Sequence, residues 1–114
     1  MAIGVGLGAL VRRFEVTGAS MEPTYVAGDR LLVLVRGRKP RVGDVVVFVD
    51  PRQSVDTDPT EGAVDTREMV KRVTAVHADG SVAVAGDNPQ ESTDSRSFGP
   101  VPAKLLRGRV LRTY

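Results

Sequence analysis

The sequence contains no cysteine, no tryptophan and a single histidine, His77. Without cysteine, the protein cannot form disulfide bonds, thiolate metal sites or a cysteine nucleophile. With one histidine, it cannot build a metal site from several histidines, and no metal or cofactor is expected. Aromatic residues make up 4% of the chain, so aliphatic side chains must form the core. Valine dominates the apolar runs, and its branched side chain favours strands.

The sequence also lacks an apolar run long enough to cross a membrane. Residues 1–11 are apolar and are followed by Arg12 and Arg13, whereas a spanning helix needs about 20 apolar residues. The basic start and cleavage site of a secretory signal are missing too. We expect residues 1–13 to be a tail, an interfacial segment or the stub of an anchor. The protein is then cytoplasmic, or peripherally membrane-associated through residues 1–13.

The length of 114 residues suits one domain, which we expect at residues 14–114. Within it, residues 50–67 hold Asp, Ser, Thr, Pro and Gly with hardly any apolar content. Such a composition predicts a long, acidic, exposed loop.

A cluster of four basic residues precedes this acidic loop in the sequence. It is either a solvated turn or a surface that meets phosphates or an anionic membrane. No aromatic residues interleave with it, so nucleic acid is not an expected partner. The cluster consists of Arg36, Arg38, Lys39 and Arg41.

Short apolar runs bounded by Gly, Pro or Asp predict strands along most of the chain. A turn is expected at 78–80 and another at 40–43, and one helical turn at 102–106. We therefore expect a mostly β fold, a compact coiled sheet or partly closed barrel. The expected strands are Phe14–Thr17, Arg30–Val35, Asp44–Val49, Met69–Val76, Ser81–Ala85 and Arg109–Thr113.

Ser20 follows the first expected strand at an abrupt corner. Gly18 permits unusual backbone angles and Pro23 fixes another. A serine held at such a corner can present its hydroxyl and its amide to one point, which a nucleophile with an oxyanion donor requires. An ordinary Ser/Pro turn has the same local pattern.

Lys71 lies within an expected strand, where side chains alternate between faces. It shares a face with Met69, Val73 and Ala75, which are apolar, so its amine either reaches out to water or is desolvated. An unperturbed lysine has a pKa of about 10.4, and neutralising it at pH 7 costs about 4.6 kcal/mol. Full burial can supply a shift of that size, after which the amine can accept a serine proton.

Four segments, in this order, resemble the bacterial signal peptidase I family of Ser–Lys serine peptidases. Any one of them alone is a weak signal, and the last segment, 86–96, is by itself equally an Asn- and Asp-capped connection. The four segments are 20–24 (SMEPT), 43–48 (GDVVVF), 71–73 (KRV) and 86–96 (GDNPQESTDSR).

The resemblance implies a coiled β domain with Ser20 as nucleophile and Lys71 as general base. It implies that Ser92 orients the lysine amine, while Asp94 and Arg96 form a supporting ion pair. It also places Gly18 and Met21 at the substrate. Some family members carry a hydroxyl residue where Gly18 stands, so the source of a second oxyanion donor is open.

The family cleaves a leader from a polypeptide after small side chains, with the substrate extended along a strand. The short chain is most similar to the nickel-type superoxide dismutase maturation proteases, which remove a propeptide. A general signal peptidase acting on secretory signal peptides is the alternative.

Two other readings of the sequence stay open. His77 could activate Ser20 in a Ser–His hydrolase, although six strand residues put His77 roughly 20 Å from Lys71. The chain could also be a non-catalytic β-barrel binding module. A self-cleaving repressor is a related idea, but no DNA-binding helix pair supports it.

Overall fold

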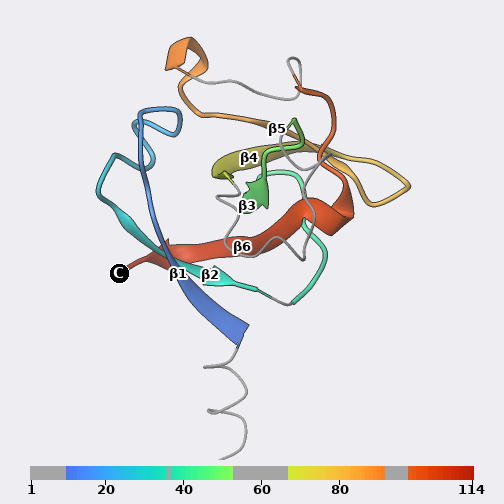
Figure 1. Cartoon of the computed structure of the whole chain (residues 1–114), viewed down its shortest axis with the longest axis horizontal. Coiled ribbons are helices and arrows are strands. Elements are labelled where there is room, and N and C mark those ends of the chain that lie inside the picture. Colours follow the sequence, from blue (N-terminus) through green and yellow to red (C-terminus); the bar gives the residue numbers. More distant parts are fainter. Residues whose placement is uncertain (1–9, 36, 53–66, 92–97) are drawn as a thin grey trace, which may run out of the picture.

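The strands of the described chain form one antiparallel sheet, ordered β1-β2-β6-β3-β4-β5 (Figure 1). The computed structural model describes residues 10–35, 37–52, 67–91 and 98–114. The mostly β fold predicted from the sequence is therefore confirmed. The elements are β1 Val11–Glu15, β2 Arg30–Leu34, β3 Val45–Val49, β4 Glu68–Val76, β5 Val82–Ala85 and β6 Leu106–Thr113, with 3-10 turns η2 Pro89–Glu91 and η3 Ala103–Leu105.

β6 lies in the middle of the sheet although it is the last strand in sequence. It pairs with β2 on one side and with β3 on the other, and Figure 1 shows it in red between them. The register shifts beside it, between Leu32 and Val33 and between Val47 and Phe48. Such irregularities increase the local twist of a sheet, and here they accompany a strong curl.

The curl brings β1 back toward β4, although three strands separate them in the sheet. The guanidinium of Arg12 on β1 donates two hydrogen bonds to the carboxylate of Glu68 on β4, at 2.8 and 2.6 Å. This ion pair joins two strands that are not neighbours. The sheet is thus coiled without being closed, since among the described strands β1 pairs only with β2 and β5 only with β4.

β3 is buried on both faces, which its continuous apolar run VVVFV requires. Because side chains alternate along a strand, Val46 and Phe48 enter one core cluster, whereas Val45 and Val47 enter the other. The second cluster also contains Met21, from the corner after β1. The core therefore fixes the position of that corner relative to the central strands.

Several boundaries differ from those expected: β6 begins at Leu106, three residues before the expected Arg109, and two other differences involve charged side chains. β1 starts at Val11, within the expected tail, because Arg12 finds Glu68 as its partner and an edge strand tolerates charged side chains. The expected exposed loop begins with Asp50, but this side chain is fully buried. Arg52 satisfies it through its backbone amide and its guanidinium, and these bonds hold the pKa of Asp50 below its usual range. Residues 53–66 of that loop lie outside the described residues.

Gly108 tests the close packing of β6 against β2. A Cβ at this position would lie 2.5 Å from Val33 Cγ1 and 2.7 Å from the Leu34 carbonyl oxygen, so Gly108→Ala should lower the free energy of unfolding by roughly 1–3 kcal/mol. Gly37→Ala is the control, because its new Cβ would meet the movable end of the Leu34 side chain. Urea unfolding of both variants measures the difference. Equal stability of the two variants would contradict the packing described for β6.

Candidate active site

Ser20 lies in the turn that follows β1, as the sequence predicts. Gly18 has φ +78°, a left-handed conformation that favours glycine and allows the chain to leave the strand direction. The turn continues with the Glu22 amide donating to the Ala19 carbonyl at 3.2 Å and the Tyr25 amide donating to the Met21 carbonyl at 3.0 Å. Ser20 is half-buried there.

Lys71 lies near the middle of β4, and its side chain is 2% exposed. Its partner across the sheet is Val46 of β3, and it shares a face with Val73, a member of the first core cluster. Its neighbour Arg72 is on the other face and half-buried. Of the two adjacent cations, Lys71 is therefore the one that enters apolar surroundings, as the alternation predicts.

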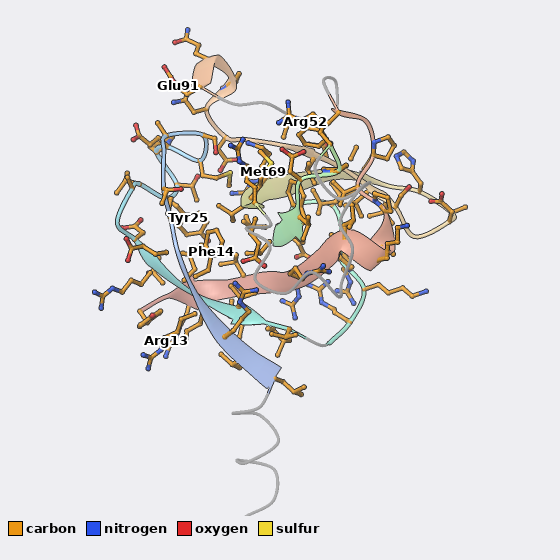
Figure 2. The ribbon with its side chains drawn as sticks, in the orientation of Figure 1. Arg13, Phe14, Tyr25, Arg52, Met69 and Glu91 are labelled. Carbon is orange, nitrogen blue, oxygen red and sulfur yellow. The ribbon has the colours of Figure 1, made fainter. Side chains whose placement is uncertain are left out.

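Ser20 and Lys71 line the same pocket of about 210 Å³. The pocket lies between the end of β1 and the beginning of β4, where the curl of the sheet brings these strands together. In Figure 2, Phe14 points toward the interior of the molecule and Arg13 points away from it. The lining residues are Phe14, Thr17, Ser20, Arg67, Glu68, Met69, Val70 and Lys71.

Asp87 links the serine corner to β4. Its carboxylate accepts two hydrogen bonds from the guanidinium of Arg72, at 2.9 and 2.8 Å, and a third from the hydroxyl of Thr24. Arg72 also donates to the carbonyl of Gly43 at 2.8 Å. The hydrogen bonds from Arg72, assisted by Thr24, hold the pKa of Asp87 below its usual range. Asp87 thus connects the turn that carries Ser20 with the residue next to Lys71.

Asn88 adds two bonds to the same corner. Its backbone amide donates to the carbonyl of Ser20 at 2.9 Å, and its side-chain amide donates to the carbonyl of Ala19 at 3.1 Å. Both acceptors are carbonyl groups, so the amide and hydroxyl of Ser20 stay available. Neither of these two groups donates a hydrogen bond to another residue in the described part of the chain.

The other site residues expected from the sequence either do not line this pocket or lie outside the described residues. Met21 is 1% exposed and packs in the second core cluster, so it does not line the pocket. Gly18 shapes the turn and does not line it either. His77 is exposed in the turn after β4, away from the lining of the Ser20 pocket. Ser92, Asp94 and Arg96 lie outside the described residues.

Thr17, Asp87 and Thr24 have roles that the sequence did not reveal. Thr17 lies three residues before Ser20 and lines the pocket. The role of Thr17 could have been predicted from the sequence, because its hydroxyl is so near the corner. The contacts of Asp87 could not, because they arise from pairing between distant segments. In the described ranges, no group of three or more His, Asp or Glu side chains is arranged to hold a metal ion.

Comparison with known proteins shows to which family this chain belongs. A family model described as signal peptidase, peptidase S26, matches residues 1–79 and 78–114. The chain belongs to the signal peptidase family. The coarser part of the resemblance drawn from the four segments is therefore confirmed.

Curated relatives include subunits of organellar proteases. Mitochondrial ATP-independent inner membrane protease subunit 1b of Arabidopsis thaliana is 37% identical over 82% of this chain and 64% of its own length. Mitochondrial inner membrane protease subunit 1 of Schizosaccharomyces pombe is 35% identical over 83% and 68%. Thylakoidal processing peptidase 1 of Arabidopsis thaliana is 27% identical over 93% and 42%. The chain thus spans about two thirds or less of these relatives.

These members of the signal peptidase family are eukaryotic organellar proteins, so they give no support to the bacterial origin implied by the resemblance. None of the three names mentions superoxide dismutase. Among the described helical turns, none has the length and apolar character needed to span a membrane.

Asp87→Asn tests the link that holds the serine corner in this signal peptidase family member. Near neutral pH the variant should lose roughly 1–2 kcal/mol of unfolding free energy, because two charge-assisted hydrogen bonds weaken. Since the pKa of Asp87 is lowered in the folded protein, its stabilisation is present above the ordinary Asp pKa of about 3.9. It is lost as the pH falls through the lower, folded-state value.

Urea unfolding between pH 7 and pH 2 measures this effect. The difference between the protein and Asp87→Asn should be constant at neutral pH and shrink in acid. Glu91→Gln is the control, because Glu91 is exposed. A difference that stays the same down to pH 2 would show that the carboxylate charge of Asp87 does not stabilise the corner.

Proposed function

We propose that this chain is a serine endopeptidase with a Ser20–Lys71 dyad that removes an N-terminal leader or propeptide from a polypeptide. The observation that carries the proposal is the common pocket of Ser20 and the almost completely buried Lys71. Burial in apolar surroundings disfavours the charged form of an amine, and an uncharged amine can act as a base. Membership of a peptidase family supports the same activity.

The catalytic cycle follows from the chemistry of these two side chains. The Lys71 amine accepts the proton of the Ser20 hydroxyl as the serine oxygen attacks the carbonyl carbon of the scissile bond. The protonated amine then donates this proton to the leaving nitrogen, and the leader remains esterified to Ser20. Water, deprotonated by the same amine, hydrolyses the ester and restores both groups.

Two donors are available for the oxyanion that forms in each step. One is the backbone amide of Ser20, which has no other acceptor among the described residues. The other is the hydroxyl of Thr17, which lines the pocket. Thr17 would thereby supply the second donor that Gly18 cannot provide, because glycine has no side chain.

The substrate is an extended polypeptide. β1 is an edge strand whose outer side has no strand partner in the described sheet, and its end leads into the pocket. An extended peptide can pair with such an edge through backbone hydrogen bonds. The names of the relatives, inner membrane protease and processing peptidase, support leader removal. The precursor of a nickel-type superoxide dismutase and secretory signal peptides are the two substrates to compare.

Substitution of the dyad tests the proposed activity. Ser20→Ala and Lys71→Met should each reduce cleavage of a leader-bearing precursor by at least about 10³-fold, because a dyad acts as one unit. Lys71→Met keeps an apolar side chain of similar length in the core, so the variant should stay folded. Sequencing of the products from both precursor types identifies the cleaved bond.

His77→Ala is the control for this experiment, because His77 is exposed and does not line the pocket. It should cleave at the normal rate. Normal cleavage by Lys71→Met together with lost cleavage by His77→Ala would replace the dyad by a Ser–His pair. No cleavage of either precursor by the intact protein would favour the binding module.

Thr17→Val tests the second oxyanion donor. The substitution keeps the shape of the side chain and removes the hydroxyl, so kcat should fall on the order of 10²-fold while KM changes little. Thr74→Val is the matched control, since Thr74 is exposed on β4 outside the pocket. An unchanged kcat for Thr17→Val would assign the oxyanion to Ser20 and other donors.

A further inference from the structure

A second pocket lies where β2 ends and β6 begins. Its volume is about 290 Å³, and it shares no lining residue with the pocket of Ser20 and Lys71. It is therefore a separate site that leader cleavage does not explain. Its lining residues are Leu34, Val35, Gly37, Arg38, Lys39, Pro40, Leu106, Gly108 and Arg109.

Three cations line this second pocket. Arg38 is already engaged, because its guanidinium donates two hydrogen bonds to Asp44, at 2.8 and 3.1 Å. Arg109 comes from the central strand β6, and its Nε atom is buried without a hydrogen-bond partner in the described part of the chain. Lys39 is exposed beside them. The hydrogen bonds from Arg38 lower the pKa of Asp44, and the charge of Arg109 also helps to lower it. Neither Arg109 nor Lys39 forms a salt bridge within the described ranges.

The guanidinium and ammonium groups of this pocket favour a phosphate as the ligand. A guanidinium presents several N–H donors that match the oxygens of a phosphate, and a lysine ammonium adds a point charge. Buried donors such as Arg109 Nε are normally satisfied by an acceptor. Gly37 and Gly108 also line the pocket, and the space beside their α carbons is filled by Leu34 and Val33.

The residues around the pocket indicate that this phosphate belongs to a lipid. The amide of Val35, a lining residue, donates to the carbonyl of Leu10, which follows the apolar sequence of residues 1–9. Val35 and Val42 are large apolar side chains that are 41% and 65% exposed. Both belong to the segment that carries Arg38 and Lys39. Cations interspersed with exposed apolar side chains are typical of segments that lie on an anionic membrane.

We propose that the pocket between the end of β2 and the start of β6 binds the phosphate group of an anionic phospholipid headgroup. Arg109 and Lys39 contact the phosphate, Arg38 is held in place by Asp44, and Val35 and Val42 face the acyl region. The site would anchor the chain to the membrane surface beside Leu10. It is independent of the proposed peptidase activity, since no residue of the Ser20 pocket takes part.

Vesicle binding by the full chain tests this site. Cosedimentation is measured with vesicles of phosphatidylcholine alone and with vesicles that also contain phosphatidylglycerol. The pocket variant is Lys39→Gln with Arg109→Gln. The control variant is Arg30→Gln with Arg112→Gln, which removes the same charge from exposed positions toward the other ends of β2 and β6. Lys39→Gln alone is added because Arg109 lies in a central strand.

The protein should bind the phosphatidylglycerol vesicles more tightly than phosphatidylcholine vesicles. Each cation near an anionic surface contributes roughly fivefold in affinity, so the pocket variant should lose about 20-fold or more. Lys39→Gln should lose about fivefold, and the control should lose at least tenfold less than the pocket variant. Inorganic phosphate should shift the amide NMR signals of Gly37 and Gly108 and compete with the vesicles.

Three results would overturn the proposal. Equal losses in the pocket and control variants would mean diffuse attraction between charges. Amide shifts with inorganic phosphate, but unchanged vesicle binding by Lys39→Gln and by the pocket variant, would make free phosphate the ligand. Absence of both vesicle preference and amide shifts would leave a solvated basic turn.

Discussion

Burial of the Lys71 side chain is the constraint on which the rest of the structure depends. A lysine enters a core only where the surrounding strands enclose it, and here β3 and the curl of the sheet provide that enclosure. The same curl brings the end of β1, and with it Ser20, to the pocket that Lys71 lines. The Arg12–Glu68 pair stabilises the curl, and Asp87 fastens the serine corner to β4.

The local features of this arrangement were predictable from the sequence. Alternation along residues 69–75 gave Lys71 apolar companions and left Arg72 on the opposite face, and both placements are confirmed. Gly18 and Pro23 marked the corner that carries Ser20. The strands were located within three residues at each end, because Gly, Pro and Asp bound the apolar runs. These features depend on neighbours in sequence, which is why the pattern revealed them.

The long-range features were not predictable, because they depend on which segments meet in space. Composition suggested that Asp50 is exposed, yet its side chain is buried and bonded to Arg52. Met21 stands next to the serine, but the turn directs it into the core. The contacts of Asp87 with Thr24 and Arg72 cross 63 and 15 residues of sequence. The roles of Ser20 and Lys71 stay predictions until cleavage is measured.

The inner position of β6 has a consequence for folding during synthesis. β1 with β2, and β3 with β4 and β5, can pair as soon as each segment leaves the ribosome. Among the described strands, β6 alone pairs with a strand of both groups. Until residues 106–113 emerge, the facing edges of β2 and β3 stay open, and β3 is entirely apolar. Open apolar edges invite pairing with other chains. We therefore expect the nascent chain to be most prone to such pairing before residues 106–113 emerge.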